Sequence, residues 1–215
     1  MRTVLLTGFE PFAGESVNPS WEAVRRLADW ECRGHRVVVH RIPCVFGAAL
    51  TALERTVALA DPVAVLGVGQ AQSRADVSVE RVAINLDDAR IPDNAGRQPI
   101  DEPVVPGGPD AYFASLPVKA IVAAVQAAGL PASVSQTAGT FVCNHLFYGA
   151  CHLRARHRPT MRVGFIHVPL SPEQAARHPG SPSMSVDSVA AALRIAVDTV
   201  LATRTDSRIA GGRLD

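Results

Sequence analysis

Short β-branched runs alternate with longer alanine- and leucine-rich stretches through most of this sequence of 215 residues. The expected strands cover Thr3–Thr7, Arg36–Ile42, Val63–Val68, Val77–Leu86, Ser133–Thr137 and Arg162–Val168. The expected helices cover Trp21–Ala28, Phe46–Ala60, Val118–Ala128, Asn144–Ala155 and Val186–Ala202. Such alternation is typical of parallel strands joined by crossover helices. The sequence therefore predicts an α/β fold, a three-layer α/β/α sandwich with a largely parallel central sheet.

One segment, Ile91–Pro117, interrupts this pattern with six prolines and three glycines. Proline and glycine at this density exclude a helix or a central strand, and loops this long usually act as lids or contact partners. The α/β pattern resumes directly afterwards, so the loop is not a domain boundary. We expect a single domain over residues 1–215, with a frayed polar tail at 203–215.

Charge and cysteine usage exclude several classes of function. The formal net charge is +1 and basic residues are spread along the chain, which disfavours nucleic acid and anionic membranes as partners. No apolar stretch approaches the roughly 20 residues of a membrane span, and Gly8 and Glu10 come too early for a signal sequence. The four cysteines show neither metal-ligand spacing nor a disulfide framework. We expect a cytoplasmic protein without metal or organic cofactor.

Cys143 has the sequence context of a nucleophile. It follows a turn at Gly139 and falls in the first turn of an expected helix, with Thr140 as the expected N-cap. Backbone N–H groups and the helix dipole favour a thiolate there, lowering a thiol pKa from roughly 8.5 to as little as about 3.5–7.5. Free cysteines are often buried small residues, and the other three lack this context. We therefore predict that Cys143 is a nucleophile.

A general base must come from seven histidines. His145 and His152 follow Cys143 by two and nine positions, which places both on the opposite side of a helix. Three more lie in polar turns: His35, His157 and His178. His40 and His167 remain, both near strand ends. Ligands gather at the carboxyl edge of open α/β sheets, which favours His167 modestly and leaves His40 as a rival.

Glu80 is the candidate third member. In a strand over Val77–Leu86 it would lie on an apolar face, and a carboxylate there needs a partner. A catalytic interpretation has Glu80 accept a hydrogen bond from His167, which would fix the imidazole tautomer. A structural interpretation pairs Glu80 with Arg74 or Arg90. The residues alone leave both open.

Several segments resemble the pyroglutamyl peptidase type I family, and the resemblance runs from Val4 to about Val200. The matching segments are Leu6–Phe12, Val79–Asn85, Ile91–Asn94, Pro106–Pro109, Ser135–His145 and Phe165–Pro169. The resemblance implies a cysteine peptidase that removes an N-terminal pyroglutamyl residue from peptides through an acyl-enzyme. It further implies a Cys143–His167–Glu80 triad, electrostatic support from Arg90, and a homo-oligomer, expected to be a tetramer.

Pyroglutamate is a compact lactam, so its pocket should combine flat apolar walls with a few hydrogen-bonding groups. By resemblance, six residues match ring-contacting positions: Phe9, Phe12, Asn18, Gln70, Phe141 and Val142. Gln70 is expected to act largely through its backbone. It ends Gly67-Val68-Gly69-Gln70, which lacks the third glycine of a dinucleotide loop and is interpreted as a ligand-contacting turn.

Three positions depart from the family pattern. Ala13 replaces a usual glycine, Cys44 stands where threonine is common, and Leu170-Ser171 replaces a usual aromatic. Cys44 is expected to place a second thiol near the pocket. Two alternatives to a peptidase remain: a nucleoside hydrolase or phosphorylase on a similar scaffold, and a catalytically silent protein that binds the lactam.

Overall fold

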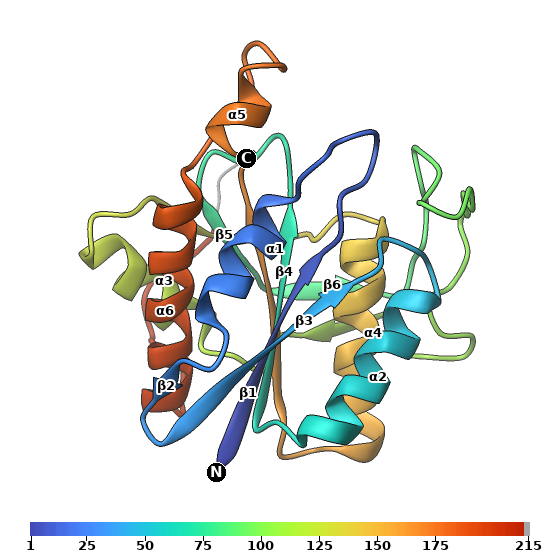
Figure 1. The fold of residues 1–215 in the computed structure, drawn as a ribbon. Coiled ribbons are helices and arrows are strands. Elements are labelled where there is room, and N and C mark those ends of the chain that lie inside the picture. Colours follow the sequence, from blue (N-terminus) through green and yellow to red (C-terminus); the bar gives the residue numbers. More distant parts are fainter. Residues whose placement is uncertain (213–215) are drawn as a thin grey trace.

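A seven-stranded sheet lies at the centre of the computed structural model, which describes residues 1–212 (Figure 1). In spatial order its strands are β2 (Glu31–Cys32), β3 (His35–Ile42), β1 (Arg2–Phe9), β4 (Ala64–Gln70), β9 (Arg162–Val168), β5 (Val77–Glu80) and β8 (Ala132–Ser135). Neighbouring strands are parallel except at β2–β3 and at β9–β5, which pair antiparallel. The predicted, largely parallel sheet is confirmed.

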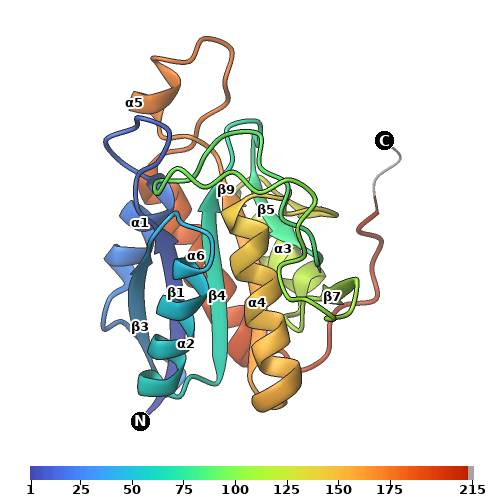
Figure 2. The ribbon, with the colours of Figure 1, turned by 90° about the vertical axis from the view of Figure 1, so that its right-hand side faces the viewer.

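Helices cover both faces of this sheet. They are α1 (Pro19–Val24) with the short 3₁₀ turn η1 (Arg25–Leu27), α2 (Ala48–Ala60), α3 (Val118–Ala127), α4 (Val142–His157), α5 (Pro172–Ala175) and α6 (Val186–Ala202). The helices α1, α3 and α6 pack on one face, and α2 and α4 pack on the other (Figures 1 and 2). The prediction of a three-layer α/β/α sandwich is therefore confirmed. No helix within residues 1–212 is long and apolar enough to cross a membrane.

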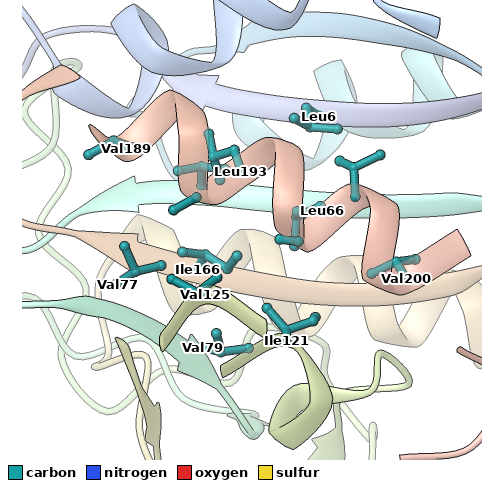
Figure 3. Packing of buried hydrophobic residues seen from close by; sticks show 14 of the residues in the cluster. Leu6, Leu66, Val77, Val79, Ile121, Val125, Ile166, Val189, Leu193 and Val200 are labelled. Atoms are coloured by element: carbon teal, nitrogen blue, oxygen red, sulfur yellow. The ribbon is translucent and has the colours of Figure 1, made fainter. Parts of the chain in front are cut away.

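The first of the two cores lies under α6. Val189 and Leu193 are four positions apart and so share one face of that helix. They pack toward Leu6, Leu66 and Ile166, which come from three neighbouring strands (Figure 3). Burying each such side chain contributes about 1.5–3 kcal/mol.

The second core lies between the same strands and the pair α2 and α4. Leu5 and Val65, the neighbours in sequence of residues in the first core, face this side and pack with Leu53 of α2 and Phe147 of α4. Successive side chains of a strand point to opposite faces, so strands covered on both sides read as continuous apolar runs. This explains the apolar runs Val4–Leu6 in β1 and Ala64–Val68 in β4.

The expected single strand over Val77–Leu86 is wrong, because the chain leaves the main sheet at Arg81. The strand β5 ends at Glu80, and β6 (Val82–Ile84) pairs antiparallel with β7 (Ala111–Phe113) in a separate two-stranded sheet. The Arg81 N–H donates to the Ser135 carbonyl, and the Arg81 carbonyl accepts from the Ala114 N–H. The loop Ile91–Pro117 thus contributes a strand of its own, which its proline content did not suggest.

Residues 203–212, the described part of the expected tail, form no helix or strand but contact the rest of the fold. The Asp206 carboxylate accepts hydrogen bonds from the Lys119 and Ala120 N–H groups at the start of α3, at 3.0–3.2 Å. A carboxylate in this position satisfies unpaired amides and opposes the positive end of the helix dipole. The Gly211 carbonyl accepts from Arg81 at 3.0 Å. The remaining tail positions, 213–215, lie outside the described residues.

Candidate active site

Cys143 lies in the first turn of α4, which begins at Val142. The N-cap is Phe141, with extended backbone and no side-chain cap. The expected cap, Thr140, is wrong, because its hydroxyl donates instead to the Asp88 carbonyl at 2.7 Å. Amides of a first helical turn have no acceptor within the helix. Here they border the position of the thiol, as the sequence predicted.

The Cys143 Sγ packs against strand β4 at a position that only glycine can occupy. A β-carbon added at Gly69 would lie 2.7 Å from that sulfur, and one at Gly67 would lie 2.5 Å from the Phe165 ring. The interpretation of this glycine segment as a turn is therefore wrong, since both glycines lie within the strand. Their missing side chains make room for the thiol and the ring.

His167 and Glu80 meet where the sheet changes from parallel to antiparallel pairing. His167 on β9 is in register with Gly69 of β4 on one side and Ser78 of β5 on the other. Its Nδ1 lies 2.8 Å from the Glu80 Oε1, and both side chains are buried. A carboxylate accepting from Nδ1–H fixes the tautomer and leaves Nε2 to exchange a proton. No hydrogen-bond partner of Nε2 is found in the described part of the chain.

Arg74 completes this charged group. Its Nη2 lies 3.6 Å from the Glu80 Oε1 and donates to the Ser135 Oγ at 2.8 Å and the Thr137 carbonyl at 2.9 Å. Glu80 therefore makes both of the contacts between which the sequence could not choose, the hydrogen bond to His167 and an ion pair with Arg74. Charge compensation of this kind is required to keep a carboxylate ionised in an apolar interior.

The other histidines lie outside the pocket that contains Cys143. His145 and His152 form hydrogen bonds to Asp87 and to a tyrosine hydroxyl, as expected for residues that face away from the thiol. His40 lies beside a separate hollow between β3 and α2. Among the histidines, all of which lie within residues 1–212, only His167 lines the same pocket as Cys143.

The electrostatics of Cys143 differ from the sequence-based expectation. Burial raises the pKa of its thiol well above the ordinary value, and the neighbouring Cys44 and Glu80 raise it further. The expected lowering at a helix start is therefore wrong. Contact with apolar groups such as Phe165 removes the water that a thiolate would need. Burial thus favours the thiol form of Cys143, and His167 lines the same pocket.

Cys143 and His167 line the same pocket, which has a volume of about 280 Å³. Five of the six predicted ring-contacting residues line it: Phe9, Phe12, Asn18, Gln70 and Phe141. The sixth, Val142, has its side chain in the hydrophobic core and does not line the pocket. The expectation that Cys44 lies near the pocket is confirmed, whereas Arg90 is exposed and outside the lining.

Aromatic rings form part of the wall of this pocket. The Phe141 ring lies 6.1 Å from Phe12 and 5.4 Å from Phe46, between ring centroids. Tilted and edge-on pairs of this kind add about 0.5–1.5 kcal/mol beyond burial. Ala13, which leads away from Phe12, has φ of +52°, the left-handed region that glycine adopts most easily. The glycine that the family resemblance implies here would adopt this conformation with less strain.

Gln174 is a pocket-supporting residue that the sequence analysis missed. It is fully buried, and its Nε2 lies 3.2 Å from the Gln70 Oε1 and 3.3 Å from the Val17 carbonyl. Ser171, one of the departures from the family pattern, forms a capping box with Gln174 at the start of α5. The spacing of serine and glutamine three residues apart could have indicated this cap. No comparable motif marked Arg74.

No cluster of three or more histidine, cysteine, aspartate or glutamate side chains within residues 1–212 is arranged to hold a metal ion. A thiol and an imidazole line the pocket, a buried carboxylate contacts the imidazole, and the thiol lies in the first turn of a helix. On an α/β/α sandwich, this combination is typical of a cysteine hydrolase.

Comparisons with known sequences and structures identify the family of cysteine hydrolases to which the chain belongs. The chain belongs to the pyroglutamyl peptidase family, whose model matches residues 2–203. Pyrrolidone-carboxylate peptidases from Cupriavidus taiwanensis and Ralstonia nicotianae are 61% and 58% identical, each over 100% of both chains. The solved structure of pyroglutamyl peptidase I from Bacillus amyloliquefaciens has a TM-score of 0.95 at 47% identity, covering 97% of this chain and 99% of that one. A mutant pyrrolidone carboxyl peptidase from Pyrococcus furiosus has a TM-score of 0.91 at 40% identity, covering 93% and 98%.

Proposed function

We propose that this protein hydrolyses the amide bond after an N-terminal pyroglutamyl residue, with Cys143 as nucleophile, His167 as proton carrier and Glu80 orienting His167. The observation that carries the proposal is the 2.8 Å contact between the His167 Nδ1 and the Glu80 Oε1, beside the pocket that Cys143 also lines. Family membership supplies the substrate class, N-terminally pyroglutamylated peptides.

In the first half of the reaction, the Cys143 sulfur attacks the pyroglutamyl carbonyl carbon while its proton passes to the His167 Nε2. The carbonyl oxygen becomes an oxyanion that the first-turn amides of α4 are placed to bind, each such donor contributing about 2.7–4 kcal/mol. The intermediate collapses as the amide C–N bond breaks, and the leaving amine takes the proton from His167. The product is a thioester between pyroglutamate and Cys143.

In the second half, water releases pyroglutamate from the thioester. His167 takes one proton from the water, whose oxygen attacks the thioester carbonyl, and the sulfur leaves and recovers that proton. The imidazolium that forms twice in this cycle is stabilised by the Glu80 carboxylate. Because burial raises the pKa of Cys143, proton transfer to His167 must accompany attack.

The ring of pyroglutamate fits against the aromatic side chains of the pocket. The rings of Phe9, Phe12 and Phe141 offer flat apolar walls there. The side-chain carbonyl of Gln70 is occupied by Gln174, which leaves the Gln70 backbone for the ligand, as the resemblance implies. Asn18 uses its Oδ1 to cap α1 and its Nδ2 to bond the Glu10 carbonyl, so it also shapes the pocket wall.

The test compares a fluorogenic pyroglutamyl amide with its prolyl analogue, using the wild-type protein and Cys143→Ala. We expect release from the pyroglutamyl amide alone, and loss of release in the variant. A proline ring lacks the lactam carbonyl, so polar groups of the pocket would stay unpaired. Phosphate-dependent cleavage of nucleosides, or lactam binding without turnover, would contradict the proposal.

We also propose a cytoplasmic homotetramer. All four cysteines are free, and a thiol nucleophile stays reduced in a reducing compartment. The tetramer follows from the family resemblance, and exposed apolar side chains at Leu59, Ile100 and Phe113 offer surface for self-association. Native mass spectrometry should show four copies, and a monomer at micromolar concentration would contradict this. Cell fractionation tests the compartment.

A further inference from the structure

The pocket lining combines two kinds of side chain. Phe9, Phe12 and Phe141 are aromatic, whereas Arg74 is charged and His167 is titratable. The Glu80 Oε1 lies between His167 and Arg74, 2.8 Å from the His167 Nδ1 and 3.6 Å from the Arg74 Nη2. The guanidinium therefore lies on the His167 side of the pocket.

The residue that leaves must also lie on the His167 side of the pocket. His167 has to deliver a proton to the departing amine, so the amine nitrogen lies within hydrogen-bond reach of its Nε2. One extended residue advances the chain by only about 3.3–3.6 Å. A carboxylate on the first residue after the scissile bond therefore stays close to His167, and the carboxylate of a longer peptide lies farther out.

Arg74 has the charge and the free donors to meet such a carboxylate. It is the only lysine or arginine that lines the pocket within residues 1–212. Its Nη2 contacts Glu80, Ser135 and Thr137. The Nε and Nη1 groups have no acceptor in the described part of the chain. Its side chain is 20% exposed, so the remaining donors are not sealed off. Guanidinium donors match carboxylate oxygens in geometry and charge.

We propose that Arg74 binds the free carboxylate of the residue that leaves, so that pyroglutamyl dipeptides are preferred over the same peptides with a capped C-terminus. This proposal rests on the proposed function. It names Arg74 as a specificity-determining residue and dipeptides as the favoured substrate class.

The test measures kcat/KM for pyroglutamyl-alanine and for pyroglutamyl-alaninamide, as release of pyroglutamate, with the wild-type protein and Arg74→Met. The two leaving amines differ in basicity, but that difference is the same for every variant and cancels in a ratio of ratios. We expect Arg74→Met to lower the acid-to-amide ratio about threefold to tenfold, as for a partly exposed ion pair. Arg74→Lys should keep most of the preference.

Arg156→Met is the matched control, since it removes an exposed arginine outside the pocket and should leave the ratio unchanged. The wild-type protein provides a second measurement that needs no variant. Its preference for the acid should fall as salt is raised to about 1 M, because salt screens an accessible charge pair.

Two results would overturn the role of Arg74: an unchanged ratio in Arg74→Met, or a wild-type ratio that does not respond to salt. Equal losses on both substrates would likewise show that Arg74 acts only through Glu80 or through folding. Each of these leaves pyroglutamate release by the wild-type protein in place. If the wild-type protein releases none from either substrate, the proposed function itself fails and the role of Arg74 fails with it.

Discussion

At the scale of single residues, the position of the Cys143 sulfur depends on the absence of a side chain at Gly69. We predict that Gly69→Ala lowers kcat/KM about 100-fold, because the added methyl would displace the Cys143 sulfur by a sizeable fraction of an ångström or more. Steady-state kinetics on a pyroglutamyl amide, beside a thermal melt, check this. Gly212→Ala is the control, since among residues 1–212 its β-carbon would meet no atom within 4 Å apart from those of its chain neighbours. Full activity in Gly69→Ala would contradict the packing described.

Glu80 provides the second test at this scale. We predict that Glu80→Gln lowers kcat about 10²- to 10⁴-fold, because the charge that stabilises the His167 imidazolium is lost. Asp87→Asn is the matched control, since Asp87 makes a buried 2.7 Å contact with His145 on the same helix as Cys143 but outside the pocket. It should destabilise the fold and keep most of kcat. Equal losses of kcat would contradict a special role for Glu80.

Residue identities were the most predictable part of the site. Cys143 could be chosen from its glycine turn and helix start, and Glu80 and His167 from motif and strand ends. Arg74 and Gln174 reach the site through tertiary contacts with Glu80 and Gln70, which no local pattern encodes. The raised pKa of Cys143 was missed for the same reason, since burial is a property of the assembled fold.

At the scale of elements, the short helix α5 lies beyond the ends of β4 and β9 in both views (Figures 1 and 2). We predict that Ser171→Ala costs about 1 kcal/mol through the lost cap and raises KM severalfold, because Gln174 would release Gln70. Ser185→Ala is the matched control, since it removes the N-cap of α6 outside the pocket lining. Ser185→Ala should lower the free energy of unfolding by a similar amount and leave KM unchanged. An unchanged KM in Ser171→Ala would contradict the link from α5 to the pocket.

Strand and helix types were predictable, and their ends were not. The break at Arg81 arises because its backbone pairs with Ser135 and Ala114, residues far along the chain. The same holds for the tail, where Asp206 supplies a cap to a helix that begins at Val118. Apolar periodicity reports which residues are buried, but the partner that ends an element is chosen by the tertiary fold.

At the scale of the whole molecule, two cores share one sheet, and we propose that the chain unfolds as a single domain. We predict that its stability falls above about pH 9. Burial raises the pKa of both Cys44 and Cys151 to about 12, so the native state keeps protons that the unfolded state has lost. Each of these thiols lowers the free energy of unfolding by about 1.4 kcal/mol per pH unit in this range.

Urea unfolding between about pH 9 and 9.5 measures this slope, where most tyrosine side chains are still protonated. Cys151→Ala should reduce the slope by about 1.4 kcal/mol per pH unit, whatever its effect on absolute stability. An unchanged slope would contradict the burial of the Cys151 thiol. Two separate transitions would contradict the single domain.

The most direct test of the account is to trap the acyl-enzyme. Wild-type protein, Cys143→Ala and Cys44→Ala are mixed with a pyroglutamyl amide, quenched in acid, and examined by peptide mass spectrometry. The account predicts a pyroglutamyl thioester on the peptide that contains Cys143, present in the wild type and in Cys44→Ala and absent in Cys143→Ala. Turnover by Cys143→Ala, or an adduct on Cys44, would contradict it.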